Sequence, residues 1–113
     1  TPPMTDALIL EARALAGTNP TLIELIRFTR AHDPTDDFRQ QQGSQFEARR
    51  DEMLAAAQAF VFTGTPFTGS AAEVLLCMAH CVASAPYLGW PQAQVELYLG
   101  TLLRRIAEAT PSA

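Results

Sequence analysis

The sequence predicts an all-α protein, a single compact bundle of about five helices that spans residues 1–113. Apolar residues recur every three or four positions along nearly the whole chain, which is the spacing of one helix face. The helix-start pattern S-x-x-E occurs twice. No β-hairpin pattern and no internal repeat interrupts this periodicity. With 113 residues, of which 48% are hydrophobic, the chain is long enough to bury a core as one domain.

Two helices are expected before the first polar break in the chain. Thr5 can cap a helix that runs to Ala16, where a glycine follows and stops it. Asn19 and Pro20 then fit the cap and the first position of a second helix, because the missing N–H of proline would be unpaired there anyway. This second helix is expected to run to about Ala31.

The middle of the chain leaves two alternatives open. Residues 32–37 are polar and include Pro34, which disfavours helical conformation at the residue before it. Ser44–Glu47 is a capping box that would begin a new helix, but it competes with one continuous helix over residues 36–62. The sequence does not decide between these two arrangements, and it predicts helix over residues 45–61 in both.

Two further helices complete the predicted bundle. Residues 64–69 form a loop, because two glycines and a proline enforce it. A second capping box, Ser70–Glu73, begins a helix that ends at Ala85–Pro86. Its stretch Val74–Ser84 contains no Asp, Glu, Lys or Arg, so neighbours must surround this helix on most sides. The last helix is expected over Pro91–Ala109, with an inner seam formed by Val95, Leu99, Leu102 and Ile106.

Charge and composition exclude several classes of function. The net charge is −4, and all eight basic residues are arginine, which is typical of a GC-rich bacterial genome. Arg49–Arg50 is followed at once by Asp51–Glu52, so no basic stripe for nucleic acid is present and direct nucleic-acid binding is not expected. No secretory signal and no apolar run of about 18 residues is visible. We therefore expect a cytoplasmic protein without membrane contact, whose two cysteines are reduced.

Cys77, His80 and Cys81 are the strongest candidates for chemistry. Residues three and four apart share a helix face, and two thiolates with an imidazole are ligands that Zn²⁺ or Cu(I) accepts. A metal site needs three or four ligands, however, and the flanking residues are apolar. We therefore expect buried structural cysteines and no metal. A metal- or redox-sensing module that uses these three residues remains the alternative function.

Two other patterns fail the requirements of the sites they resemble. Residues 64–69 follow the glycine spacing of a phosphate loop, but the chain has no lysine and no strand precedes the loop. Asp33, Asp36 and Asp37 beside His32 lack the alternate spacing and the glycine of a calcium loop. A nucleophile paired with a base is also missing. We expect neither an enzyme nor a bound cofactor.

An excess of apolar and arginine residues outside the inner helix faces predicts a protein-binding surface. Gly100 costs its helix about 1 kcal/mol relative to alanine, and close approach of another helix is the usual compensation. The candidate protein-binding residues are Leu10, Phe67, Trp90, Leu97, Gly100, Arg104 and Arg105.

These observations favour a small protein that acts by binding another protein, as an inhibitor, an anti-activator, an immunity protein or an adaptor. The acidic net charge suits a basic partner, such as a DNA-binding regulator or a toxin. A homodimer is the alternative use of the same surface.

Overall fold

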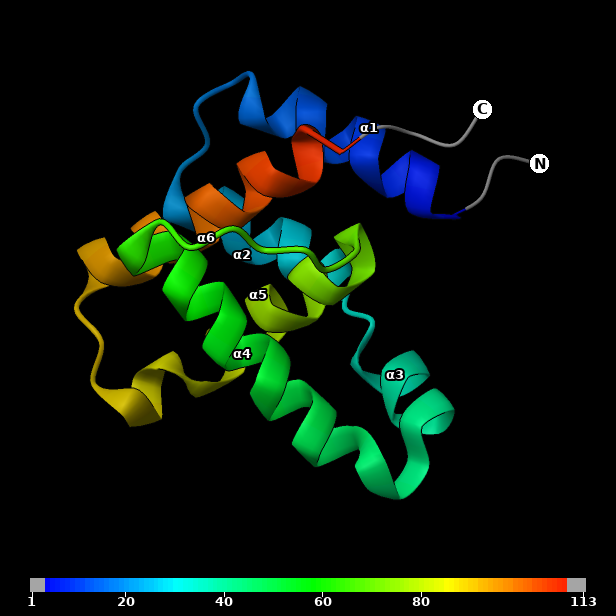
Figure 1. Cartoon of the computed structure of the whole chain (residues 1–113). Coiled ribbons are helices and arrows are strands. Elements are labelled where there is room, and N and C mark those ends of the chain that lie inside the picture. The colour runs from blue at the N-terminus through cyan, green and yellow to red at the C-terminus, as the bar shows by residue number, and fades with distance from the viewer. Residues whose placement is uncertain (1–3, 110–113) are drawn as a thin grey trace.

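The computed structural model describes residues 4–109, with side chains from residue 7 onward, and every regular element in that part of the chain is helical. The predicted all-α fold is confirmed. The elements are α1 (Met4–Ala16), α2 (Leu22–Ala31), α3 (Thr35–Gln42), the 3-10 turn η1 (Gly43–Gln45), α4 (Phe46–Thr63), α5 (Ala71–Leu88) and α6 (Gln92–Ala107). Figure 1 shows α1, α2, α4, α5 and α6 gathered into one body, with α3 standing off it.

The first and last helices, α1 and α6, lie side by side and antiparallel (Figure 1). Arg13 near the end of α1 donates hydrogen bonds from Nε to the carbonyl of Ala107 and from Nη2 to the carbonyl of Ala109, each at 3.1 Å. Carbonyls at the end of a helix have no partner within the helix, so this arginine satisfies the end of α6. The contact fixes the C-terminal end of α6 against α1.

Helix α5 runs through the core, as its lack of charge predicted. Eight of its residues are buried, and Val74, Cys77 and Met78 have no exposed surface. The inner seam of α6 is also confirmed by burial, at Val95, Leu99, Leu102 and Ile106. These two helices pack against each other and supply most of the large side chains that are fully enclosed.

Helix α5 is also long and apolar enough to cross a membrane by length and composition, with a mean hydropathy of 1.4 over 18 residues. This differs from the expectation that no such run exists, because alanines and cysteines raise the average between the larger apolar residues. The core helix of a soluble bundle passes the same test. In the described fold this helix is packed against α2, α4 and α6.

The middle of the chain forms two helices, which settles the alternatives left open by the sequence. Gly43 breaks the chain between α3 and α4 with a φ of 57°, a left-handed value that glycine adopts without strain. Ser44 does not cap α4, because Gln45 holds the cap position and makes no side-chain hydrogen bond there. None of the residues of α3 is buried, and its packing partners are α4 and η1.

Several predicted helix ends move by one to three residues. α1 already includes Thr5, so Thr5 is not its cap, and the side chain of Thr5 lies outside the described residues. Asn19 turns the chain with a φ of 54°, and Thr21 caps α2 instead through a T-x-x-E capping box with Glu24. α5 continues past Pro86 and ends at Gly89, whose φ of 71° closes the helix.

Candidate functional site

The residues predicted to bind a partner do not form one surface. Leu10 on α1 and Leu97 on α6 are both exposed, at 55% and 52%. Because α1 is antiparallel to α6 and Arg13 reaches the C-terminal end of α6, Leu10 lies toward that end and Leu97 toward the other. The two leucines are therefore separated along the α1–α6 pair.

Phe67 is buried, which corrects its predicted place on the surface, and Arg105, which stays partly exposed, holds the loop of Phe67. Arg105 donates from Nη2 to the carbonyls of Phe67 and Gly69, at 3.3 and 3.0 Å. This clamp holds the loop before α5 against α6, and the Phe67 ring turns inward to 7% exposure. The ring packs so closely over Gly69 that a side chain there would come within 2.5 Å of it.

Gly100 is partly buried on α6, and no helix of the described chain makes the close approach predicted for it. A Cβ built at Gly100 would have Arg104 Nη1 as its nearest described neighbour, at 3.9 Å. Beside it lies a small hollow of about 110 Å³, bordered by Ala16 and Leu103 among others. Arg104 is exposed and donates to the hydroxyl of Thr101 at 3.4 Å. The glycine is therefore not needed for packing within the described part of this chain.

Trp90 belongs to an aromatic surface that the sequence analysis identified only in part. We call Phe62, Tyr87, Leu88 and Trp90 the aromatic end. Phe62 lies at the end of α4, Tyr87 and Leu88 lie at the end of α5, and Trp90 lies in the connector to α6. Their exposed fractions are 42% for Phe62, 90% for Tyr87 and 55% for Leu88, whereas Trp90 is partly buried.

Two rings of the aromatic end, Phe62 and Trp90, rest on one buried side chain. Trp90 meets Phe62 edge to face at 6.0 Å between centroids, and both rings contact Tyr98 of α6, at 5.4 and 6.1 Å. Tyr98 is only 1% exposed. Aromatic rings in such offset or edge-to-face contacts hold one another in place. Phe62 and Trp90 are therefore held in place before any partner arrives.

The helices that carry the aromatic end contribute almost no charge to it. Glu73 is the sole Asp, Glu, Lys or Arg between Met53 and Val95, and it lies in the first turn of α5, at the opposite end of that helix. Large apolar residues at a helix end, within a long stretch without charge, were the sequence signal that could have identified this surface, and Leu88 in particular.

The structure does not bring Cys77, His80 and Cys81 together as a ligand set. Burial raises the pKa of the Cys77 thiol to about 12, with the Glu73 carboxylate as a smaller cause, and burial raises the pKa of Cys81 to about 11. Both thiols are free and stay protonated at neutral pH, and it is the thiolate that binds metals and reacts. Within the residues whose side chains are described, no group of three or more His, Cys, Asp or Glu could hold a metal ion.

His80 and the two thiols have different surroundings. The His80 ring lies 3.3 Å from the Ser84 hydroxyl, and its pKa is lowered by burial first and by the charge of Arg50 on α4 second. The thiols instead lie near Tyr98 on α6, whose pKa is raised by burial and then by Cys77 and Cys81. The imidazole therefore faces α4 and the thiols face α6.

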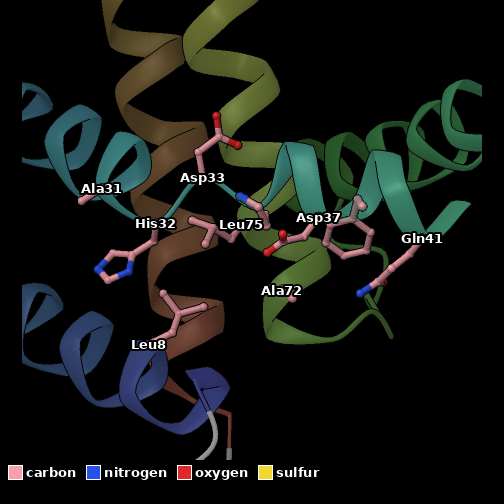
Figure 2. A pocket seen from close by; sticks show the side chains of 10 residues that line it. Leu8, Ala31, His32, Asp33, Asp37, Gln41, Ala72 and Leu75 are labelled. Carbon is pink, nitrogen blue, oxygen red and sulfur yellow. The ribbon is translucent and has the colours of Figure 1, made fainter. Parts of the chain in front are cut away.

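A pocket of about 580 Å³ lies between α3 and the helix bundle, and the sequence analysis missed it (Figure 2). Its apolar lining comes from four parts of the chain: α1, the end of α2 with the turn that follows, α3, and the first turns of α5. The apolar residues are Leu8, Ala31, Pro34, Phe38, Ala72 and Leu75. The polar residues are His32, Asp33, Asp37 and Gln41.

The polar groups around this pocket differ in how far they are already engaged. His32 Nε2 pairs with the Glu11 carboxylate of α1, and its ring lies 4.9 Å from the Phe28 ring. Asp33 accepts from the Thr35 backbone N–H at 2.9 Å and from the Thr35 hydroxyl. Asp37 has no hydrogen bond or ion pair to any side chain described from residue 7 onward. Figure 2 shows its side chain reaching from α3 toward α5.

Comparison with known proteins does not identify the function of this chain. No protein-family model, no curated protein and no solved structure matches the chain. The function has to be inferred from its own surfaces.

Proposed function

We propose that this protein is a binding module that holds a partner protein on its aromatic end. One observation carries the proposal: Phe62 is exposed in a ring cluster with Trp90 that Tyr98 holds from below, and the exposed Tyr87 and Leu88 lie just before Trp90 in the chain. Large aromatic side chains in fixed positions are the residues that most often dominate the energy of protein interfaces. The inhibitor, anti-activator, immunity protein and adaptor roles expected from the sequence all use such a surface.

The energetics of the aromatic end favour binding. Full burial of one exposed Leu or Phe side chain contributes about 1.5–3 kcal/mol. Because the contacts of Phe62 and Trp90 with Tyr98 already restrain their rings, little side-chain entropy remains to be lost. A few such residues therefore suffice to anchor an interface of ordinary size.

The chemistry of the aromatic end also describes the partner. The apolar centre bears no charge from α4, α5 or the connector, so the partner should present an apolar surface there. Arg30 of α2 borders Tyr87 across a hollow of about 340 Å³ and supplies a polar rim on that side. Apolar contact therefore leads recognition in this proposal, and the acidic net charge acts at longer range on a basic partner in the cytoplasm.

Three matched substitutions test which surface is used. Leu88→Glu places a carboxylate in the aromatic end, Leu97→Glu places one on the outer face of α6, and Ile23→Glu changes a residue of α2 that is 63% exposed. All three should fold, because each side chain is more than half exposed. Each variant is immobilised and used to capture proteins from cells of the native host, and the captured proteins are identified by mass spectrometry.

The proposal predicts that one protein is retained by the native chain, by Ile23→Glu and by Leu97→Glu, and is lost with Leu88→Glu. Loss with Leu97→Glu and retention with Leu88→Glu would contradict it and return the site to α6. Light scattering of the same four proteins detects a homodimer. A dimer that only Leu88→Glu dissociates would make a second copy of the chain the partner.

A further inference from the structure

We propose that the pocket between α3 and the bundle binds a small amphipathic molecule that carries an ammonium group. Its apolar part would lie against Leu75 and Phe38, and its ammonium group would face Asp37. Ala72 and Leu75 place the site at the N-terminal end of α5, away from Tyr87 and Leu88 at its C-terminal end, and Asp33 lies between the two because it also lines the hollow beside Tyr87.

The size and the lining of the pocket favour a small organic molecule. Its volume of about 580 Å³ lies within the range of about 300–1,000 Å³ that is typical of ligand pockets. Six of its ten lining residues are apolar and the polar ones are few, which is the usual composition of such sites. Leu8 and Leu75 are 7% and 2% exposed, so the bundle side of the pocket is set by the packed core.

The charges at the pocket select a cation over an anion. Asp33 and Asp37 line it, and no arginine does. Neither aspartate is held in an ion pair with a described basic side chain, whereas Asp36 in the same turn of α3 is paired with Arg39 at 3.3 Å. The N-terminus of α3 opposes a cation with roughly half an elementary charge. Asp33 is already bonded to Thr35, but the full negative charge of Asp37 outweighs the helix N-terminus, so the pocket attracts an ammonium group and repels a carboxylate.

A bound ligand would stabilise the packing of α3 against the bundle. Phe38 is the only aromatic or aliphatic residue of α3, whose sequence is TDDFRQQQ, and it lines the pocket while remaining partly exposed. A ligand with an apolar body would bury the Phe38 ring against Leu75 and close α3 onto the bundle. Apolar burial supplies affinity in this account, and the aspartates supply the charge preference.

A series of probes with one alkyl chain and different head groups separates these two contributions. The probes are octylammonium, octanol and octanoate, each titrated into the full chain at neutral pH. Nuclear magnetic resonance follows the amides of Leu8, Phe38 and Leu75, with the indole N–H of Trp90 as a distant control. Octylammonium should bind most tightly and octanoate most weakly, and the pocket amides should shift while the Trp90 signal stays in place.

Matched variants assign the charge preference to Asp37. Asp37→Asn should weaken octylammonium binding about three-fold and leave octanol binding unchanged, because an exposed ion pair contributes modestly. Asp36→Asn, one residue away and outside the pocket lining, should leave all three affinities unchanged. Ala72→Leu, which adds bulk inside the pocket, should weaken all three probes together.

Three results would overturn the proposal. They are the absence of saturable shifts at the pocket amides with any probe, equal affinity for octylammonium and octanoate, and an unchanged ammonium preference in Asp37→Asn. Each is readable whether or not a partner protein is known, so this test stands apart from the capture experiment at the aromatic end.

Discussion

The two ends of α5 differ in the residues that surround them. At its C-terminal end, Tyr87 and Leu88 join the aromatic end, where α4, α5 and the connector bring no charge, Arg30 and Asp33 border Tyr87, and Tyr98 is enclosed beneath Phe62 and Trp90. At its N-terminal end, Ala72 and Leu75 face a pocket with an acidic rim, and the opposite wall is α3, a helix with no buried residue.

This difference teaches that exposure has two distinct causes in one small bundle. At the aromatic end Phe62 is exposed although it packs with Trp90 on the enclosed Tyr98, so this ring is held in place for contact. Groups at the pocket are exposed because α3, the helix that covers the pocket, packs only weakly against the bundle. This region should therefore unfold locally before the rest of the protein. Substitutions should therefore have unequal costs at the two ends.

The largest expected effect compares the aromatic residues of the two ends. Tyr98→Ala should lower the free energy of unfolding by about 3–5 kcal/mol, because it empties a site under two other rings. Phe38→Ala in α3 should cost less than about 1 kcal/mol, since that ring is only partly buried. Urea denaturation followed by circular dichroism measures both. Equal costs would remove the contrast between the ends.

Alkaline pH should weaken the fold through the buried thiols. Cys77 keeps its proton in the folded protein up to about pH 12, whereas in the unfolded chain the thiol loses it near its ordinary pKa of 9.0. Between these values the folded state binds more protons, so the free energy of unfolding falls as pH rises, by at most about 1.4 kcal/mol per pH unit for one thiol.

The matching variant is Cys77→Ala, whose stability should be lower at neutral pH but should fall less steeply above pH 9. Denaturation curves taken at several alkaline pH values give both slopes. A variant with the same slope as the native chain would show that Cys77 is not the group that titrates, and would point to Cys81 or Tyr98 instead.

Helix caps give a smaller effect and test where the helices begin. Ser70→Ala should cost about 1 kcal/mol, because the Ser70 hydroxyl accepts from the Glu73 backbone N–H at 3.3 Å and caps α5. Ser44→Ala should change stability by less than about 0.5 kcal/mol, because Ser44 lies in η1 and caps nothing. Thermal denaturation of the two variants side by side measures both losses of stability. A larger loss for Ser44→Ala than for Ser70→Ala would show that Ser44 caps α4 after all.

The smallest expected effect is a gain in stability. Gly100→Ala should raise the free energy of unfolding by about 0.5–1 kcal/mol, because a methyl group meets nothing closer than 3.9 Å and alanine is the better helix former. The same denaturation curves report it. A loss of stability that appears only at high protein concentration would show instead that a second copy packs on this glycine.

The sequence predicted the elements whose causes are local. The charge-free stretch Val74–Ser84 and the Ser70 capping box located α5, and the spacing of apolar residues identified the α6 seam. The helix start predicted at the Ser44 capping box was wrong, although this box follows the same S-x-x-E pattern as the Ser70 box. Gly43, at the break before it, takes a left-handed conformation, and the chain enters α4 through a 3-10 turn that leaves Ser44 no cap to make.

The candidate site could be predicted less well, because exposure depends on contacts between distant residues. Phe67 was expected on the surface, but Arg105, 38 residues further along the chain, holds its loop so that the ring turns inward. The pocket joins α1, α2, α3 and α5, and no spacing in the sequence reports such a meeting. Leu10 and Leu97 are exposed as predicted, but only the antiparallel packing of α1 and α6 shows that they lie apart.

Native-state hydrogen exchange tests most directly whether one end of this molecule is fixed and the other is loosely closed. Amides of α3 should exchange through local openings with a much smaller free energy than amides of α5 and α6, which should exchange near the free energy of global unfolding. Octylammonium should slow exchange in α3 and leave the α6 seam unchanged. Protection in α3 equal to that in α5 without any ligand would contradict the account.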